Sequence, residues 1–130
     1  MTLTRPVMAV ACALTLAASA SAHHNMTTQF DLNQRFSVNG SLTKVDWRNP
    51  HIYLYVEVRN DAGRPEVWAF EGPSPSFFRQ NDVERADFER SLAKPVMVDA
   101  SRSRDGSHAG LLRQIALADG KVVSMCPQNC

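Results

Sequence analysis

The stretch HIYLYVEVR, residues 51–59, alternates apolar and polar side chains along its whole length and decides the fold. One parity carries the apolar residues Ile52, Leu54, Val56 and Val58. The other parity carries His51, Tyr53, Tyr55, Glu57 and Arg59. Because side chains alternate across a strand, this period of two predicts a half-buried β-strand with its aliphatic face toward a core.

Strand patterns continue on both sides of this stretch. Residues 36–47 alternate as well, but the parity of their apolar residues changes between Gly40 and Lys44, which predicts a β-bulge and a sharp bend. Turn sequences separate the later strand candidates, with NDAGRP at residues 60–65 and Asp119-Gly120 near the end. The later candidates are residues 66–72, 95–101, 110–118 and 121–125.

Residues 72–92 interrupt the strand patterns with helix signals. Ser74 can cap a helix that has Pro75 at its first position, and Asp82 can cap a second short helix that runs through Ser91. Three strands, a helical crossover and then two strands predict a mainly β fold with one or two short helices. We expect a small OB-like, five-stranded antiparallel barrel on which the final strand folds back. The alternative is an open antiparallel sheet with a crossing helix.

The N-terminal 22 residues have the pattern of a secretory signal peptide. Arg5 precedes a short apolar run, which is followed by overlapping Ala-x-Ala sites. Cleavage is therefore expected before His23, or alternatively before Ser21, with export to the bacterial periplasm or beyond. The resulting organisation is a signal peptide at 1–22, an extended segment at 23–35, an OB-like domain at 36–125 and a cysteine-containing tail at 126–130.

The charge balance and hydropathy of the mature chain argue against two classes of partner. The whole chain has 14 basic and 13 acidic residues, and Arg5 leaves with the signal, so the mature chain carries no net charge. Phosphate neutralisation by a basic surface is therefore not indicated, and we expect no nucleic-acid partner. No apolar segment after residue 22 is long enough to cross a bilayer as a helix.

Four stretches carry a resemblance to a known family. They are AHHN at 22–25, VDWRNPHIYLYVEV at 45–58, EGPSPS at 71–76 and DGSHAGLLRQIALADGKV at 105–122. Together they resemble the domain of unknown function 6152 family, small exported bacterial proteins with Ala-His-His, Trp-x-Asn-Pro-His, Glu-Gly-x-Ser-Pro and Asp-Gly-Ser motifs. Asn25 stands where Ser is usual, and Pro73 where a small residue is more common. The resemblance implies an exported β-rich domain and supplies no activity.

The four histidines, His23, His24, His51 and His108, are the candidate metal ligands. Imidazole nitrogen suits copper and other divalent metals. Cleavage before His23 would place an α-amine and an imidazole on one residue, where both can chelate copper, with His51 or His108 completing the site. Cleavage before Ser21 would instead create a Ser-Ala-His sequence that binds copper(II) in a square plane. The alternative is that these histidines are structural or surface residues.

Other candidate residues carry weaker signals. Cys126 and Cys130 favour a small disulfide in an oxidising compartment, although a redox pair or copper ligands remain alternatives. Trp47 and Trp68 fit core packing better than stacking on a ligand. Neither HExxH nor GxSxG is present, so an enzyme is not expected. The leading hypothesis is an exported copper-binding protein. The alternative is a binding or adaptor module that recognises an envelope protein or glycan through the barrel face.

The N-terminus and the cysteines can be checked together. We expect the exported protein to begin at His23, or else at Ser21, and to contain a Cys126–Cys130 disulfide. Intact mass spectrometry of protein isolated without reductant measures both, because the disulfide lowers the mass by two hydrogens. Retention of Met1 would contradict export with cleavage, and two free thiols would contradict the disulfide.

Overall fold

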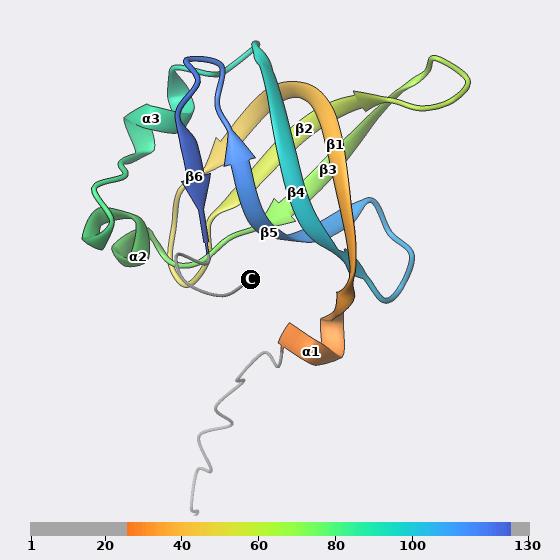
Figure 1. Cartoon of the computed structure of the whole chain (residues 1–130), viewed down its shortest axis with the longest axis horizontal. Helices are drawn as coiled ribbons and strands as arrows, with labels where there is room; N and C mark the ends of the chain where they lie inside the picture. Colours follow the sequence, from red (N-terminus) through yellow and green to blue (C-terminus); the bar gives the residue numbers. More distant parts are fainter. Residues whose placement is uncertain (1–25, 126–130) are drawn as a thin grey trace, which may run out of the picture.

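The computed structural model describes residues 26–125, which form a β-rich domain of six strands and three short helices (Figure 1). In chain order the elements are α1 (Met26–Gln29), β1 (Phe30–Asp46), β2 (Tyr53–Arg59), β3 (Pro65–Glu71), α2 (Pro75–Gln80), α3 (Arg85–Glu89), β4 (Pro95–Ser103), β5 (Ala109–Ala116) and β6 (Val122–Ser124). The expected mainly β fold with short helices is therefore confirmed.

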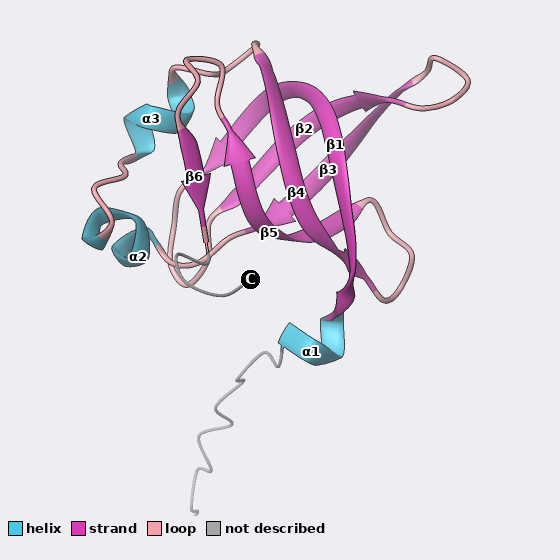
Figure 2. Ribbon diagram, in the orientation of Figure 1, coloured by secondary structure: helices cyan, strands magenta, loops and turns pink. Residues whose placement is uncertain are grey.

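The strands form one sheet whose pairing closes into a ring. Their order is β3-β2-β1-β4-β5-β6, and an additional pairing joins β3 to β5. Five strands, β1 to β5, thus make a closed circuit, while β6 extends the sheet from β5 (Figure 2). The β3–β5 pairing is parallel and the other strand pairings are antiparallel. The ring therefore differs in this one pairing from the wholly antiparallel arrangement that the sequence predicts.

The alternation in residues 51–59 gives the faces that it predicts. Ile52, Leu54 and Val56 are fully buried, and Val58 packs against the same core at partial burial. Val98 of β4 and Ile115 of β5, which pair with each other, belong to the same buried core. The side chains of the opposite parity are half-buried or exposed. Burial of this aliphatic face contributes to the stability of the domain together with the rest of the core.

The bulge predicted in β1 is present. The register of β1 against β2 shifts between Leu42 and Lys44, which restores the phase of the apolar residues on either side. Gly40 lies just before the shift, where a Cβ atom would stand 2.3 Å from the carbonyl oxygen of Glu57. Glycine is therefore required here by the close approach of the β2 backbone.

Two boundaries differ from the sequence predictions. The extended segment predicted at 23–35 contains α1, and β1 begins at Phe30 because its first residues pair with β4. The second crossover helix begins after Glu84, whose extended backbone and exchange of hydrogen bonds with Asp87 form a capping box. Asp82 has a φ of +55°, a left-handed conformation that an N-cap residue does not adopt.

Helices α2 and α3 lie together at one flank of the strands (Figure 1). Ser74 precedes α2 with Pro75 at its start as predicted, although the Ser74 side chain makes no capping hydrogen bond. Phe78 of α2 and Phe88 of α3 are fully buried and contact each other edge to face, with ring centroids 5.5 Å apart. Trp47 packs on both rings, which joins the helical crossover to the end of β1.

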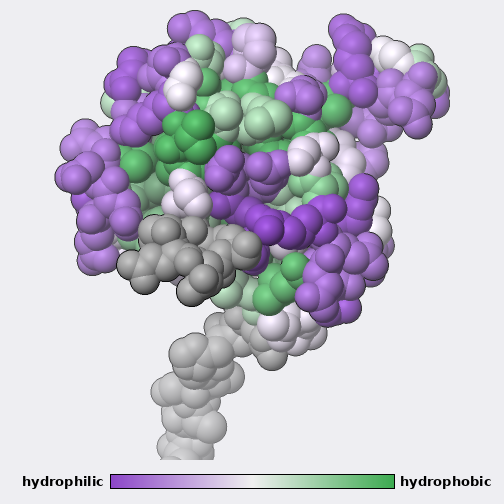
Figure 3. Space-filling model, viewed as in Figure 1, coloured by the Kyte–Doolittle hydropathy of each residue, from purple (hydrophilic) through white to green (hydrophobic). Residues whose placement is uncertain are grey.

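The outer surface is mixed in polarity. Polar side chains cover much of the face seen in Figure 3, with apolar patches between them. None of the helices within residues 26–125 has the length and apolar character needed to cross a membrane.

The assignment of faces on β2 gives a stability prediction. Val56→Asp places a carboxylate without a partner in the core, so we expect it to lower the free energy of unfolding by about 4 kcal/mol or more. Tyr55 is the neighbouring residue, and its side chain lies on the opposite face of β2. Tyr55→Ser should therefore lower the free energy of unfolding by only about 1–2 kcal/mol. Urea denaturation followed by circular dichroism measures both variants. Equal losses of stability would contradict the face assignment.

Candidate functional site

Two of the sequence motifs meet at one end of the β2–β3 pair. Asn49, Pro50 and His51 lead into β2, while Glu71 is the last residue of β3 and Gly72 follows it. The antiparallel register places Tyr53 opposite Glu71. Beyond the strands, the amide of Gly72 donates to the Ile52 carbonyl at 2.9 Å, and the amide of Ile52 donates to the Pro73 carbonyl at 3.1 Å. The backbone therefore fixes His51 beside Glu71.

Glu71 is a buried carboxylate with two side-chain partners. Its exposed fraction is 6%. The hydroxyl of Tyr53 donates to Oε2 at 3.0 Å, and Nδ1 of His51 lies 3.1 Å from Oε1. Burial of a carboxylate is costly unless such hydrogen bonds satisfy its oxygens. Glu71, Tyr53 and His51 therefore form one polar unit, which we call the Glu71 triad.

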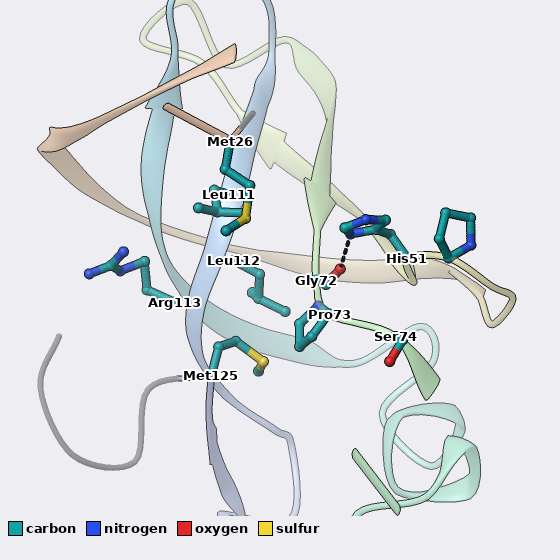
Figure 4. A pocket seen from close by; sticks show the side chains of 10 residues that line it. Met26, His51, Gly72, Pro73, Ser74, Leu111, Leu112, Arg113 and Met125 are labelled. Atoms are coloured by element: carbon teal, nitrogen blue, oxygen red, sulfur yellow. Dashed lines mark hydrogen bonds between the residues drawn. The ribbon is translucent and has the colours of Figure 1, made fainter. Parts of the chain in front are cut away.

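The hydrogen bonds of His51 define which ring nitrogen carries hydrogen. Its Nδ1 also lies 3.1 Å from the carbonyl oxygen of Gly72 (Figure 4). A carbonyl oxygen only accepts, so Nδ1 must be the protonated nitrogen that donates. Among the described residues, Nε2 has no hydrogen-bond partner. In a neutral ring, Nε2 therefore carries the lone pair that binds a proton or a metal ion.

Tyr53 is held in its protonated form by the same unit. Burial, followed by the negative charge of Glu71 and the hydrogen bond to it, raises the pKa of Tyr53 to about 12. Near neutral pH the phenol is therefore a permanent hydrogen-bond donor to Glu71.

His51 lines two cavities of different character. The first has a volume of about 400 Å³ and a mostly apolar wall, which includes Met26, Leu111 and Leu112 (Figure 4). The second has a volume of about 450 Å³ and a polar wall formed by Gln29, Arg48, Asn49, Pro50, His51, Tyr53 and Glu71. The imidazole and the Glu71 triad therefore stand where a ligand can approach.

The structure does not bring His108 to the Glu71 triad. His108 precedes β5 and stacks on Trp68, with ring centroids 4.9 Å apart, and its Nε2 lies 3.5 Å from Glu66. Glu66 and Glu71 differ in parity along β3, so their side chains leave opposite faces of the strand. His51 and His108 thus occupy separate environments.

The other predicted site residues have different outcomes. His23, His24, Cys126 and Cys130 lie outside the described residues. Within residues 26–125, no group of three or more His, Cys, Asp or Glu side chains is arranged to hold a metal ion.

Both tryptophans have aromatic neighbours. Trp68 contacts Phe36, Phe70 and His108, and Trp47 contacts the two phenylalanines of the crossover helices. Each indole is at most half-exposed and packs within the fold, which agrees with the packing interpretation. These contacts give no support to tryptophan stacking on a glycan.

The sequence did not reveal the partnership of Glu71 with His51 and Tyr53. In the sequence, Glu71 stands out only as the first residue of the motif stretch EGPSPS, and its spacing identifies no acid/base partner. The sequence does place His51 and Tyr53 on the same side of one strand, because they are two residues apart. The register of β2 against β3 was needed to show that Glu71 lies opposite Tyr53.

These features define a small β-domain in which a buried carboxylate and a backbone carbonyl orient a histidine between two cavities. The chain belongs to the family of unknown function DUF6152, whose family model matches residues 10–114. This finding confirms the resemblance seen in the sequence. No curated protein and no solved structure matches the chain.

The raised pKa of Tyr53 predicts how stability depends on alkaline pH. A group whose pKa is higher in the folded state contributes stability that is complete below its unfolded value, near 10. That contribution is lost as pH rises through the folded value of about 12. Urea midpoints measured from pH 9 to pH 12 should therefore fall less steeply for Tyr53→Phe than for the wild type. Tyr55→Phe is the comparison variant and should change the slope less than Tyr53→Phe, because the charge of Tyr55 is the smallest of the causes that raise the pKa of Tyr53. Identical slopes for all three proteins would contradict the assignment.

Proposed function

We propose that this domain binds copper(II) after export, through His51 together with the N-terminal residues His23 and His24. The observation that supports His51 is the pair of acceptors at its Nδ1, the Glu71 carboxylate and the Gly72 carbonyl. Histidines that bind metals usually donate their second ring N–H to such groups, which fixes the tautomer and raises the basicity of the other nitrogen. His51 therefore has the support that a metal-binding imidazole needs.

The path of the chain favours the N-terminal histidines as the additional ligands. Met26 lines the apolar cavity beside His51, and Gln29 lines the polar one. His24 precedes Met26 by two residues in the sequence, and two residues of extended chain span at most about 7 Å. Cleavage before His23 would add its α-amine to the available nitrogen donors. The proposal omits His108, which precedes β5 and contacts Glu66 and Trp68 on the other face of β3 from Glu71.

The experiment is a copper(II) titration of three chains that begin at Ser21, Ala22 and His23. We expect the chain that begins at His23 to bind through its amine, its ring and His51. The chain that begins at Ala22 should bind more weakly, because its amine is on another residue. The chain that begins at Ser21 should form the square-planar Ser-Ala-His site, which has a different visible spectrum.

Substitutions in the folded domain separate these sites. In the chain that begins at His23, His51→Ala should weaken copper binding strongly, and Glu71→Gln should weaken it about tenfold by removing the charge behind the imidazole. His108→Ala is the matched control and should leave affinity unchanged. In the chain that begins at Ser21, His51→Ala should have little effect. The proposal would be refuted if the chain that begins at His23 bound copper(II) no more tightly than a short His-His peptide.

A further inference from the structure

The apolar cavity beside His51 has the size and lining of a small-molecule site. Its volume of about 400 Å³ lies within the range of ligand pockets in proteins. Most of the wall is hydrocarbon or thioether, contributed by Met26, Pro50, Pro73, Leu111, Leu112 and Met125. Such a wall favours a ligand with an aliphatic body, because burial of apolar surface drives its binding.

Arg113 gives this cavity an unused hydrogen-bond donor. The residue lies on β5 and lines the cavity, and its side chain is half-buried. Its Nε is buried and has no hydrogen-bond partner, and the ion pairs within residues 26–125 do not include its guanidinium. Nε itself has no surface that a ligand can touch, but the residue is only half-buried, so an acceptor from a ligand is assigned to the rest of the guanidinium. A hydrogen bond from this charged group to a carboxylate would favour binding.

The charged side chains around the cavity indicate the sign of the charge that such a ligand carries. Its lining contains one guanidinium and one imidazole, from Arg113 and His51, and no acidic side chain. From these observations we infer that the cavity binds a small amphiphilic carboxylate, with the carboxylate on the Arg113 guanidinium and the aliphatic chain against the apolar wall. A guanidinium matches a carboxylate because two parallel N–H groups can donate to its two oxygens.

This inference stands apart from the proposed copper site. The two share only His51, and the carboxylate is assigned to Arg113 without any metal ion. Titrations in the presence of EDTA exclude copper and therefore measure ligand binding in the cavity alone. A negative result in either the copper titration or the carboxylate titration does not decide the other.

The experiment is a titration of the folded domain with decanoate below its micelle concentration, with EDTA present, followed by amide chemical shifts. At pH 7 decanoate is ionised. We expect saturable shifts at Gly72, Leu112 and Met125. Decanol has the same chain without the charge. Its affinity should be lower by about tenfold or more, because a hydrogen bond to a charged group is lost.

Substitutions at Arg113 test the assigned donor. Arg113→Gln should lower decanoate affinity about tenfold or more and leave decanol affinity unchanged. Arg113→Lys keeps the charge and should retain part of the decanoate affinity. This variant tests the assigned donor if circular dichroism shows that the glutamine variant folds poorly. Arg64→Gln, in the exposed β2–β3 turn, is the matched control and should bind as the wild type.

Three results would overturn the inference. They are an absence of saturable shifts with wild-type protein, decanol binding as tight as decanoate binding, and unchanged decanoate affinity in both Arg113 variants.

Discussion

The fold depends on the ability of one long strand to pair with two different partners. The first part of β1 pairs with β4 and its last part pairs with β2, and the two ladders overlap at Ser41. A flat strand could not serve both ladders in a closed circuit, because closure requires strong local curvature. The bulge at Leu42–Lys44 provides that bend, and Gly40 allows the β2 backbone to approach at the same point.

The closed ring also determines the position of the Glu71 triad. Once β2 is fixed against β1, its register with β3 places Tyr53 opposite Glu71, and the parallel β3–β5 pairing holds the other edge of β3. A slip of one residue would exchange the faces of β3 and separate the carboxylate from both partners. Strand register therefore positions Tyr53 and Glu71, and backbone hydrogen bonds of Ile52 just beyond the strands position His51.

The sequence predicts well those features that depend on neighbouring residues. The aliphatic face of β2 and the bulge in β1 both follow from parity, and Pro75 marks the first residue of α2. Asp82 shows the limit of local chemistry, because a good capping side chain cannot act from a left-handed backbone, and Glu84 takes that position. His51 and His108 were grouped by residue type alone, whereas the faces of β3 separate them.

Glu71 could not be assigned a partner from the sequence, because its role depends on a contact across two strands. Its burial also explains why the contact matters. A carboxylate that is 6% exposed needs donors, and Tyr53 and His51 supply them. Tyr53 has no other ionisation state near neutral pH, so it remains a fixed donor. His51 is different, because donation from Nδ1 leaves the second nitrogen of the same ring without a partner in the described fold. The interaction that stabilises the buried carboxylate thus also fixes the orientation of the imidazole at the cavities, and one arrangement of three side chains accounts for both features of this end of the domain.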